Sequence, residues 1–104
     1  MKKVNARIPK NLQGILWSKA VSEIDPKTDR VYLIHQVLRY GSLKDINWLF
    51  HFCPRSQVIK TFLEAPLPVY DLHSFNFVRS YILKIENGLD QNAYIKALYT
   101  RKIV

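Results

Sequence analysis

Apolar residues recur at helical spacing between Asp25 and Gly41, and both ends of this stretch carry helix boundary signals. Asp25 suits an N-cap, and Pro26 suits the first helical position, where a backbone N–H is not needed. Gly41 predicts a left-handed helix end, which a residue with a Cβ resists. The apolar arc between these ends is wide, so we predict that this helix is central. Its apolar positions include Val31, Ile34, His35 and Leu38.

Further helix signals divide the rest of the chain. Three glycines and five prolines in 104 residues are too few turn-forming residues for an all-β fold. Ser42 and Asp45 have capping-box spacing, Pro54 opens another segment, and Asp71 and Asp90 suit two more N-caps. We predict an all-α fold with five or six short helices in an irregular bundle around the second and fifth. The expected helices are 12–17 (capped by Asn11), 26–40, 43–52, 54–64, 72–86 and 91–101.

The length fits one domain, because 104 residues leave no room for a second stable core. Residues 1–10 are polar and basic, and Pro9 disfavours helix before it, so we expect a loosely held arm. Residues 11–104 then form a single helical domain with a basic C-terminal helix. No apolar run approaches the roughly 18 residues of a membrane span. Cys53 is the sole cysteine, which suits a reducing compartment, so we expect a cytoplasmic protein without membrane contact.

The net charge of +8 is concentrated at the two ends of the chain. Residues 1–20 carry five bases and no acid, residues 91–104 carry three bases and no acid, and the segment between them is neutral. Such basic ends favour phosphate groups or an acidic protein surface as binding partners. The competing interpretation is that their charge only keeps the protein soluble. Among the end residues, the candidate nucleic-acid contacts are Lys2, Lys3, Arg7, Lys10, Lys96, Arg101 and Lys102.

No pattern of residues indicates catalysis, a metal or a cofactor. His51 and Cys53 lie two positions apart on one expected helix and diverge by about 200°, so the histidine cannot activate the thiol. His35 and His73 add no metal-ligand spacing. Four of the eight carboxylates are explained as helix caps, and no glycine-rich phosphate loop is present. We therefore expect a protein that is not an enzyme, has no cofactor, and shows no evident small-molecule substrate.

The adjacent helices 43–52 and 54–64 leave a nucleic-acid interpretation open. Their lengths are compatible with a helix-turn-helix, in which Arg55, Ser56, Gln57 and Lys60 would face base edges. The joint at Cys53-Pro54 lacks the usual glycine, and ordinary bundle packing explains the same pattern. A small DNA-binding regulator that uses this helix pair and the basic termini therefore remains the alternative.

The aromatic residues favour a protein interface instead. Tyr32, Trp48 and Phe52 exceed what a core of this size must hold, and tryptophan and tyrosine are enriched at interfaces. Burial of these side chains in the core is the competing interpretation. We take Tyr32, Trp48 and Phe52 as the candidate protein interface.

A distinctive set of residues occupies the middle of the chain. It comprises Leu16-Trp17, Ile24-Asp25, Val37-Leu38-Arg39-Tyr40-Gly41, and Asp45 three positions before Trp48-Leu49. Over about residues 16–83, this set resembles an uncharacterised family of small prokaryotic helical proteins. Ser18 and Asn76-Phe77 depart from the family pattern. Members are often encoded beside nucleotidyltransferase-type toxins of the abortive-infection class, so the resemblance implies an antitoxin-like or accessory role. The leading hypothesis is a non-enzymatic helical protein that binds a protein partner.

Overall fold

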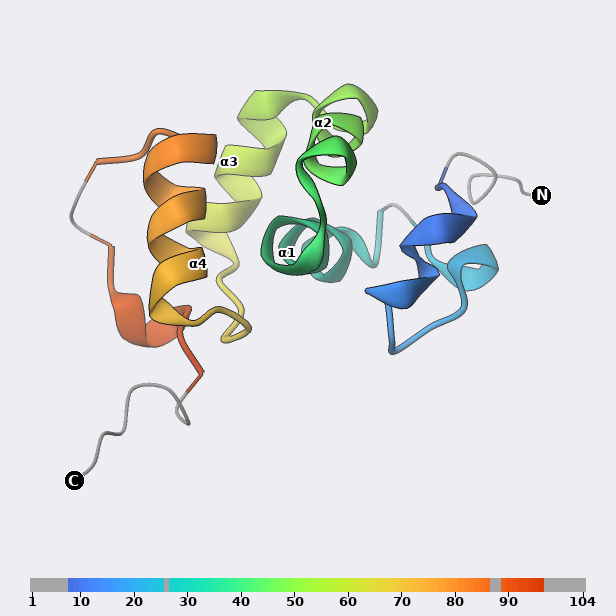
Figure 1. The fold of residues 1–104 in the computed structure, drawn as a ribbon, viewed down its shortest axis with the longest axis horizontal. Helices are drawn as coiled ribbons and strands as arrows, with labels where there is room; N and C mark the ends of the chain where they lie inside the picture. Colours follow the sequence, from blue (N-terminus) through green and yellow to red (C-terminus); the bar gives the residue numbers. More distant parts are fainter. Residues whose placement is uncertain (1–7, 26, 87–88, 97–104) are drawn as a thin grey trace.

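The computed structural model describes residues 8–25, 27–86 and 89–96, which form an all-α structure (Figure 1). The helices are α1 (Arg30–Tyr40), α2 (Leu43–Phe52), α3 (Arg55–Glu64) and α4 (Leu72–Asn76), and α4 continues as a π-helical segment (Phe77–Ile82). Short 3-10 turns cover Lys10–Gly14, Val21–Glu23 and Gln91–Ala93. No helix in the described ranges is both long and apolar enough to cross a membrane.

Helix α1 lies at the centre of the molecule, as its wide apolar arc predicts. Its six consecutive residues 33–38 are buried. Both α2 and α3 pack against it, while the N-terminal 3-10 turns lie on one side and α4 on the other, beside α3 (Figure 1). This position agrees with the expected role of the second helix, whereas α4, the expected fifth helix, lies beside α3 and away from the centre of the molecule (Figure 1).

An aromatic cluster fills the core between α3, α4 and the C-terminal segment. The ring of Phe62 is centred 4.6 Å from Tyr94, 5.9 Å from Tyr70 and 6.4 Å from Phe75. The Tyr94 hydroxyl donates to the carbonyl of Phe62 at 2.7 Å. Tyr70 also exchanges backbone hydrogen bonds with Tyr94 and Lys96, which fixes the segment 89–96 to the helices.

The start of α1 differs from the prediction. The helix begins at Arg30, because the residues before it form a hydrogen-bonded turn. Asp25 accepts from the backbone N–H of Lys27 at 2.8 Å. The Asp29 carboxylate accepts from the N–H of Asp25 and from the ammonium of Lys19, which lowers the Asp29 pKa. Asp25 therefore closes a turn and caps no helix; Pro26 lies outside the described residues.

Gly41 ends α1 for a different reason from the one expected. Its φ of −76° is not left-handed. A Cβ at this position would lie 2.6 Å from the carbonyl oxygen of Val37 and 3.0 Å from the Cβ of Asp45. Glycine is required here because a Cβ would collide with the last turn of α1 and with the Asp45 side chain of α2, which a sequence pattern alone does not reveal.

The capping box of α2 is confirmed. The Ser42 hydroxyl accepts from the N–H of Asp45, whose carboxylate accepts from the N–H of Ser42. We expect Ser42→Ala to lower the free energy of unfolding by about 1 kcal/mol, measured by urea denaturation. Ser56→Ala is the matched control, because Ser56 is exposed and its hydroxyl has no hydrogen-bond partner among the described residues. An equal effect of both substitutions would contradict the capping role.

Other predicted boundaries are confirmed or corrected as follows. Asp71 caps α4 as predicted, and Pro54 directly precedes α3. Asn11 caps nothing, since Pro9 precedes the 3-10 turn, and the buried Ile8 belongs to the core rather than to a loose arm.

The described residues contain four α-helices, not five or six. Asp90 caps only a 3-10 turn. The basic part of the predicted last helix (97–101), the arm residues 1–7 and Asn87-Gly88 lie outside the described residues.

Candidate functional site

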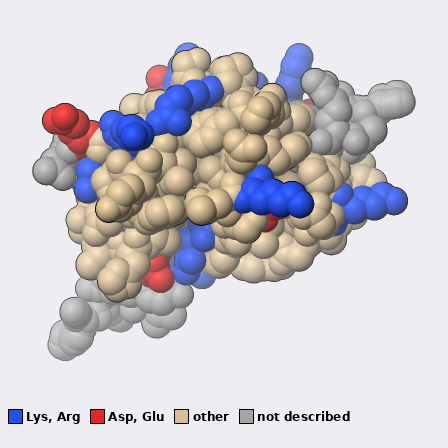
Figure 2. Space-filling view, turned by 45° about the horizontal axis from the view of Figure 1, so that its top comes forward, with Lys and Arg blue, Asp and Glu red and all other residues tan. Residues whose placement is uncertain are grey.

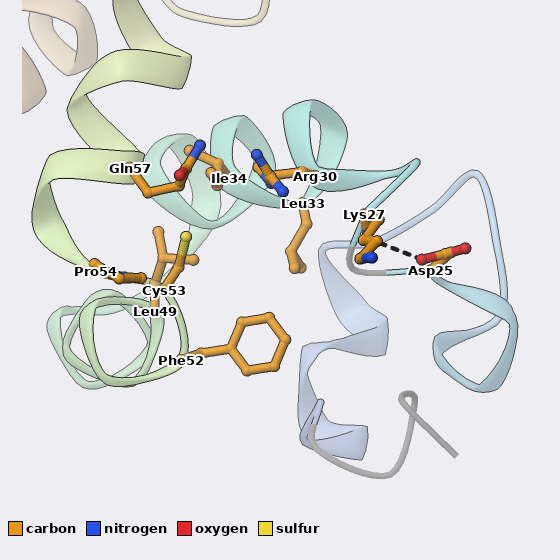
Figure 3. A pocket seen from close by; sticks show the side chains of 10 residues that line it. All are labelled: Asp25, Lys27, Arg30, Leu33, Ile34, Leu49, Phe52, Cys53, Pro54 and Gln57. Atoms are coloured by element: carbon orange, nitrogen blue, oxygen red, sulfur yellow. Dashed lines mark hydrogen bonds between the residues drawn. The ribbon is translucent and has the colours of Figure 1, made fainter. Parts of the chain in front are cut away.

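A pocket of about 560 Å³ opens where the start of α1 faces the junction of α2 and α3 (Figure 3). Its apolar floor consists of Leu33, Ile34 and Leu49, which are almost completely buried. The remaining lining residues come from the turn before α1, from the first residue of α1 and from the α2–α3 junction, so the turn, α1, α2 and α3 together build this junction pocket. They are Asp25, Lys27, Arg30, Phe52, Cys53, Pro54 and Gln57.

Two unpaired polar groups lie on one side of the junction pocket. In Figure 3 the Arg30 guanidinium and the Gln57 amide lie on the same side of the pocket, and the Phe52 ring lies on the opposite side. Both Arg30 and Gln57 are half-buried. Neither side chain has a hydrogen-bond or ion-pair partner among the residues that the structure describes. The pocket therefore combines free hydrogen-bond donors on one side with apolar surface on the other.

Cys53 is held as a protonated thiol at neutral pH. Burial raises its pKa, and the nearby Arg30 only partly opposes that shift. His51 does not activate it, because its Nδ1 faces the carbonyl of Asn47 at 2.9 Å. Cys53 is thus a lining residue of the junction pocket rather than an activated nucleophile.

The predicted protein interface is only partly exposed. Tyr32, Trp48 and Phe52 are half-buried and pack against the core. The structure brings Trp48 and Phe52 together as stacked rings 4.8 Å apart. Tyr32 is instead fixed by its hydroxyl, which accepts from the backbone N–H of Ser18 at 2.7 Å.

A more exposed aromatic pair lies on the segment that follows α4. Phe77 is 41% and Tyr81 73% exposed, and their ring centroids are 5.7 Å apart. The sequence places Tyr81 in the apolar stripe of a regular helix, with Leu72, Phe75 and Val78. The π-helical segment breaks that register, because it has more residues per turn, so Tyr81 points outward. We call Phe77 and Tyr81 the α4 aromatic pair; their spacing of four residues was the available sequence signal.

The α3 residues predicted to face DNA bases do not share one exposed face. Arg55 donates to the carbonyl of Ile82 at 2.7 Å and lies 5.2 Å from the Phe50 ring centroid. Gln57 lines the junction pocket, while Lys60 is exposed. Basic side chains are spread over the face shown in Figure 2 rather than gathered in one stripe. Lys10 is exposed and Lys96 half-buried; Lys2, Lys3, Arg7, Arg101 and Lys102 lie outside the described residues.

The Arg55 contact predicts a role in stability. Arg55 joins the start of α3 to a terminal carbonyl of the π-helical segment, so we expect Arg55→Gln to lower the free energy of unfolding by about 1 kcal/mol. Lys60→Gln removes the same charge from the same helix without breaking such a bond. Urea midpoints of the two variants measure the difference. A loss that is equal in both would show that charge, not the hydrogen bond, is responsible.

The described residues form an all-α structure with an apolar pocket at the α2–α3 junction and an exposed aromatic pair after α4. Among the described residues, no three histidine, cysteine or carboxylate side chains gather to hold a metal ion. Residues 12–62 match a family described as "Family of unknown function (DUF6922)". That segment contains part of the first 3-10 turn, the second 3-10 turn, α1, α2 and most of α3, so it resembles an uncharacterised domain family. No curated protein and no solved structure matches the chain.

Proposed function

We propose that this chain is a non-enzymatic helical binding protein that recognises a protein partner through the α4 aromatic pair. The observation that carries the proposal is the contact of two exposed aromatic rings, Phe77 and Tyr81, on one face. Aromatic side chains that are exposed and held rigidly supply large contact area at little entropic cost. The half-buried Trp48–Phe52 stack is a second candidate contact, and Tyr32 a third.

The charges near the α4 aromatic pair favour an acidic partner. Lys84 and Arg79 line a shallow hollow on the same stretch of chain as Tyr81, together with Ser80, Ile85 and Glu86. Arg79 donates to the carbonyl of Ile85 at 2.8 Å, whereas the ammonium of Lys84 has no hydrogen-bond or ion-pair partner among the described residues. An acidic residue beside an apolar anchor on the partner would match this arrangement, and the basic chain ends would steer its approach.

The resemblance to proteins encoded beside toxins supports an antitoxin-like or accessory role. In that role, the protein would mask part of a toxin sterically, so the toxin itself would be the partner. Steric masking needs shape and apolar area but no catalytic group. This agrees with our expectation that the protein is not an enzyme.

Co-purification from the native host tests the proposal. The tagged full chain is expected to retain a stoichiometric protein after nuclease treatment and in about 0.5 M salt, which screens exposed charges. The double variant Phe77→Ser/Tyr81→Ser is expected to lose that protein. Trp17→Ser is the matched control, since Trp17 is 63% exposed at the opposite end of the molecule. Equal retention by the double variant and the wild type would refute the α4 aromatic pair as the contact.

The alternative function is a small DNA-binding regulator, which the net charge of +8 favours. It predicts nuclease-sensitive nucleic acid in place of a protein partner. The affinity for duplex DNA would fall with salt, with a log–log slope of about −0.9 for each phosphate contact. Recovery of nucleic acid without protein would replace the partner-binding proposal with this one.

A further inference from the structure

We propose that the junction pocket binds a small organic anion that carries an apolar body. This site is separate from the α4 aromatic pair, so the inference stands whether or not the proposed partner surface is correct. It follows from three features of the pocket: its size, its apolar floor, and two donor side chains that have no partner among the described residues.

The unpaired donors indicate an oxyanion. Arg30 has five N–H donors in a planar fork, and Gln57 adds an amide donor on the same side of the pocket (Figure 3). Neither group is satisfied by another described residue, although both are half-buried. A carboxylate, sulfonate or phosphate group can accept hydrogen bonds from both, and such charge-assisted bonds are strong.

The charges around the pocket agree with this choice. Lys27 and Arg30 contribute two positive charges and Asp25 one negative charge to the lining. Asp25 is turned toward its own loop, where its carboxylate accepts from the N–H of Lys27. The ammonium of Lys27 has no ion-pair partner among the described residues. The lining is therefore net positive, with its cations available to a ligand.

The rest of the lining indicates an apolar body. Leu33, Ile34 and Leu49 form the floor, and the Phe52 ring lies across the pocket from the donors (Figure 3). The volume of about 560 Å³ lies within the range of small-molecule sites, roughly 300–1,000 Å³. A ligand with its anionic group at Arg30 and Gln57 would place an aromatic or branched portion against Phe52 and the leucines.

Dye binding to the full-length protein tests the site with two matched probes. The probes are 1-anilinonaphthalene-8-sulfonate and N-phenyl-1-naphthylamine, which share an aromatic body and differ in the sulfonate. The anionic dye is expected to bind at one site per chain. Arg30→Gln is expected to weaken it by about tenfold or more, while the neutral dye changes little. Lys60→Gln, which removes a cation outside the pocket, is expected to leave both affinities unchanged.

A second variant and a second readout guard against misfolding. Gln57→Met keeps the side-chain length and removes the amide, and is expected to weaken only the anionic dye, by about threefold. Cys53 lines the pocket and is the chain's only cysteine, so its alkylation by iodoacetamide reports occupancy. Saturating anionic dye is expected to slow this alkylation at least about fivefold, because a bound body covers the thiol.

Either of two results would overturn the inference. One is equal affinity of wild type and Arg30→Gln for the anionic dye, in variants whose circular dichroism shows the native fold. The other is saturable dye binding that leaves the alkylation rate of Cys53 unchanged, since the dye would then bind elsewhere.

Discussion

Acidification from pH 7 to pH 4 is expected to lower the free energy of unfolding by about 3 kcal/mol through His35 alone. His35 is completely buried in α1. Burial lowers its pKa from 6.5 to about 4, although the hydrogen bond to the carbonyl of Ala65 opposes this shift. Between pH 6.5 and 4, His35 of the unfolded chain therefore takes up a proton. In the folded protein, His35 stays neutral until the pH nears 4. The stabilisation is complete above pH 6.5 and is lost as the pH falls toward 4.

Burial is the main reason why the neutral ring of His35 is preferred, and the hydrogen bond to Tyr70 acts in the same direction. Its Nε2 lies 2.8 Å from the carbonyl oxygen of Ala65, which only accepts, so Nε2 carries the proton. Its Nδ1 lies 2.7 Å from the Tyr70 hydroxyl and accepts from it. Protonation of Nδ1 would place a charge in the core and oppose the tyrosine donor.

Urea denaturation at several pH values between 7 and 4.5 checks this expectation. This pH range excludes the effects of protonating the Asp29 and Asp71 carboxylates. Because their pKa values are lowered, their contributions to the free energy of unfolding are lost only below about pH 4. The variant His51→Gln/His73→Gln is expected to keep the pH dependence, since both side chains are exposed. His35→Leu is expected to be less stable at pH 7 but nearly independent of pH in this window. An unchanged slope in His35→Leu would contradict the assignment.

Replacement of Phe62 by alanine is expected to lower the free energy of unfolding by about 4 kcal/mol. Phe62 is completely buried, and its ring touches Tyr94, Tyr70 and Phe75 and lies 5.7 Å from His35. Removal of the ring leaves a cavity at the point where α1, α3, α4 and the C-terminal segment meet. Because the neighbouring rings are large and rigid, they cannot fill that cavity.

The control for this prediction is an exposed phenylalanine. Phe77→Ala is expected to cost about 1 kcal/mol or less, because its ring is 41% exposed. Thermal and urea denaturation measure both variants. If Phe62→Ala does not fold, Phe62→Leu, with an expected loss of about 1.5 kcal/mol, gives the same comparison. A loss at position 62 no greater than that at position 77 would mean that the aromatic cluster does not hold the fold together.

The sequence predicted the features that depend on neighbouring residues. The limits of α2, the Ser42–Asp45 capping box and the Asp71 cap of α4 match the structure because each uses contacts within three or four positions. The sequence also predicted the central position of α1, because a wide apolar arc must be buried on several sides.

The start of α1 and the exposure of Tyr81 were not predictable in this way. Lys19, ten positions before Asp29, stabilises the turn at Asp25–Asp29 through the Asp29 carboxylate. This turn lies where the local sequence predicts the start of the helix. The π-helical register after α4 turns Tyr81 away from the stripe that a period of 3.6 residues assigns to it.

By itself, the sequence determined the all-α class, the lengths of α2 and α3, and the charge at the chain ends. These follow from periodicity, caps and composition, which act locally or over the whole chain. Only the tertiary structure decided the junction pocket, the role of Arg55 and the environment of His35. Each depends on groups brought together from segments about 20 to 35 residues apart. Such contacts are set by how the helices pack, which no local pattern of residues encodes.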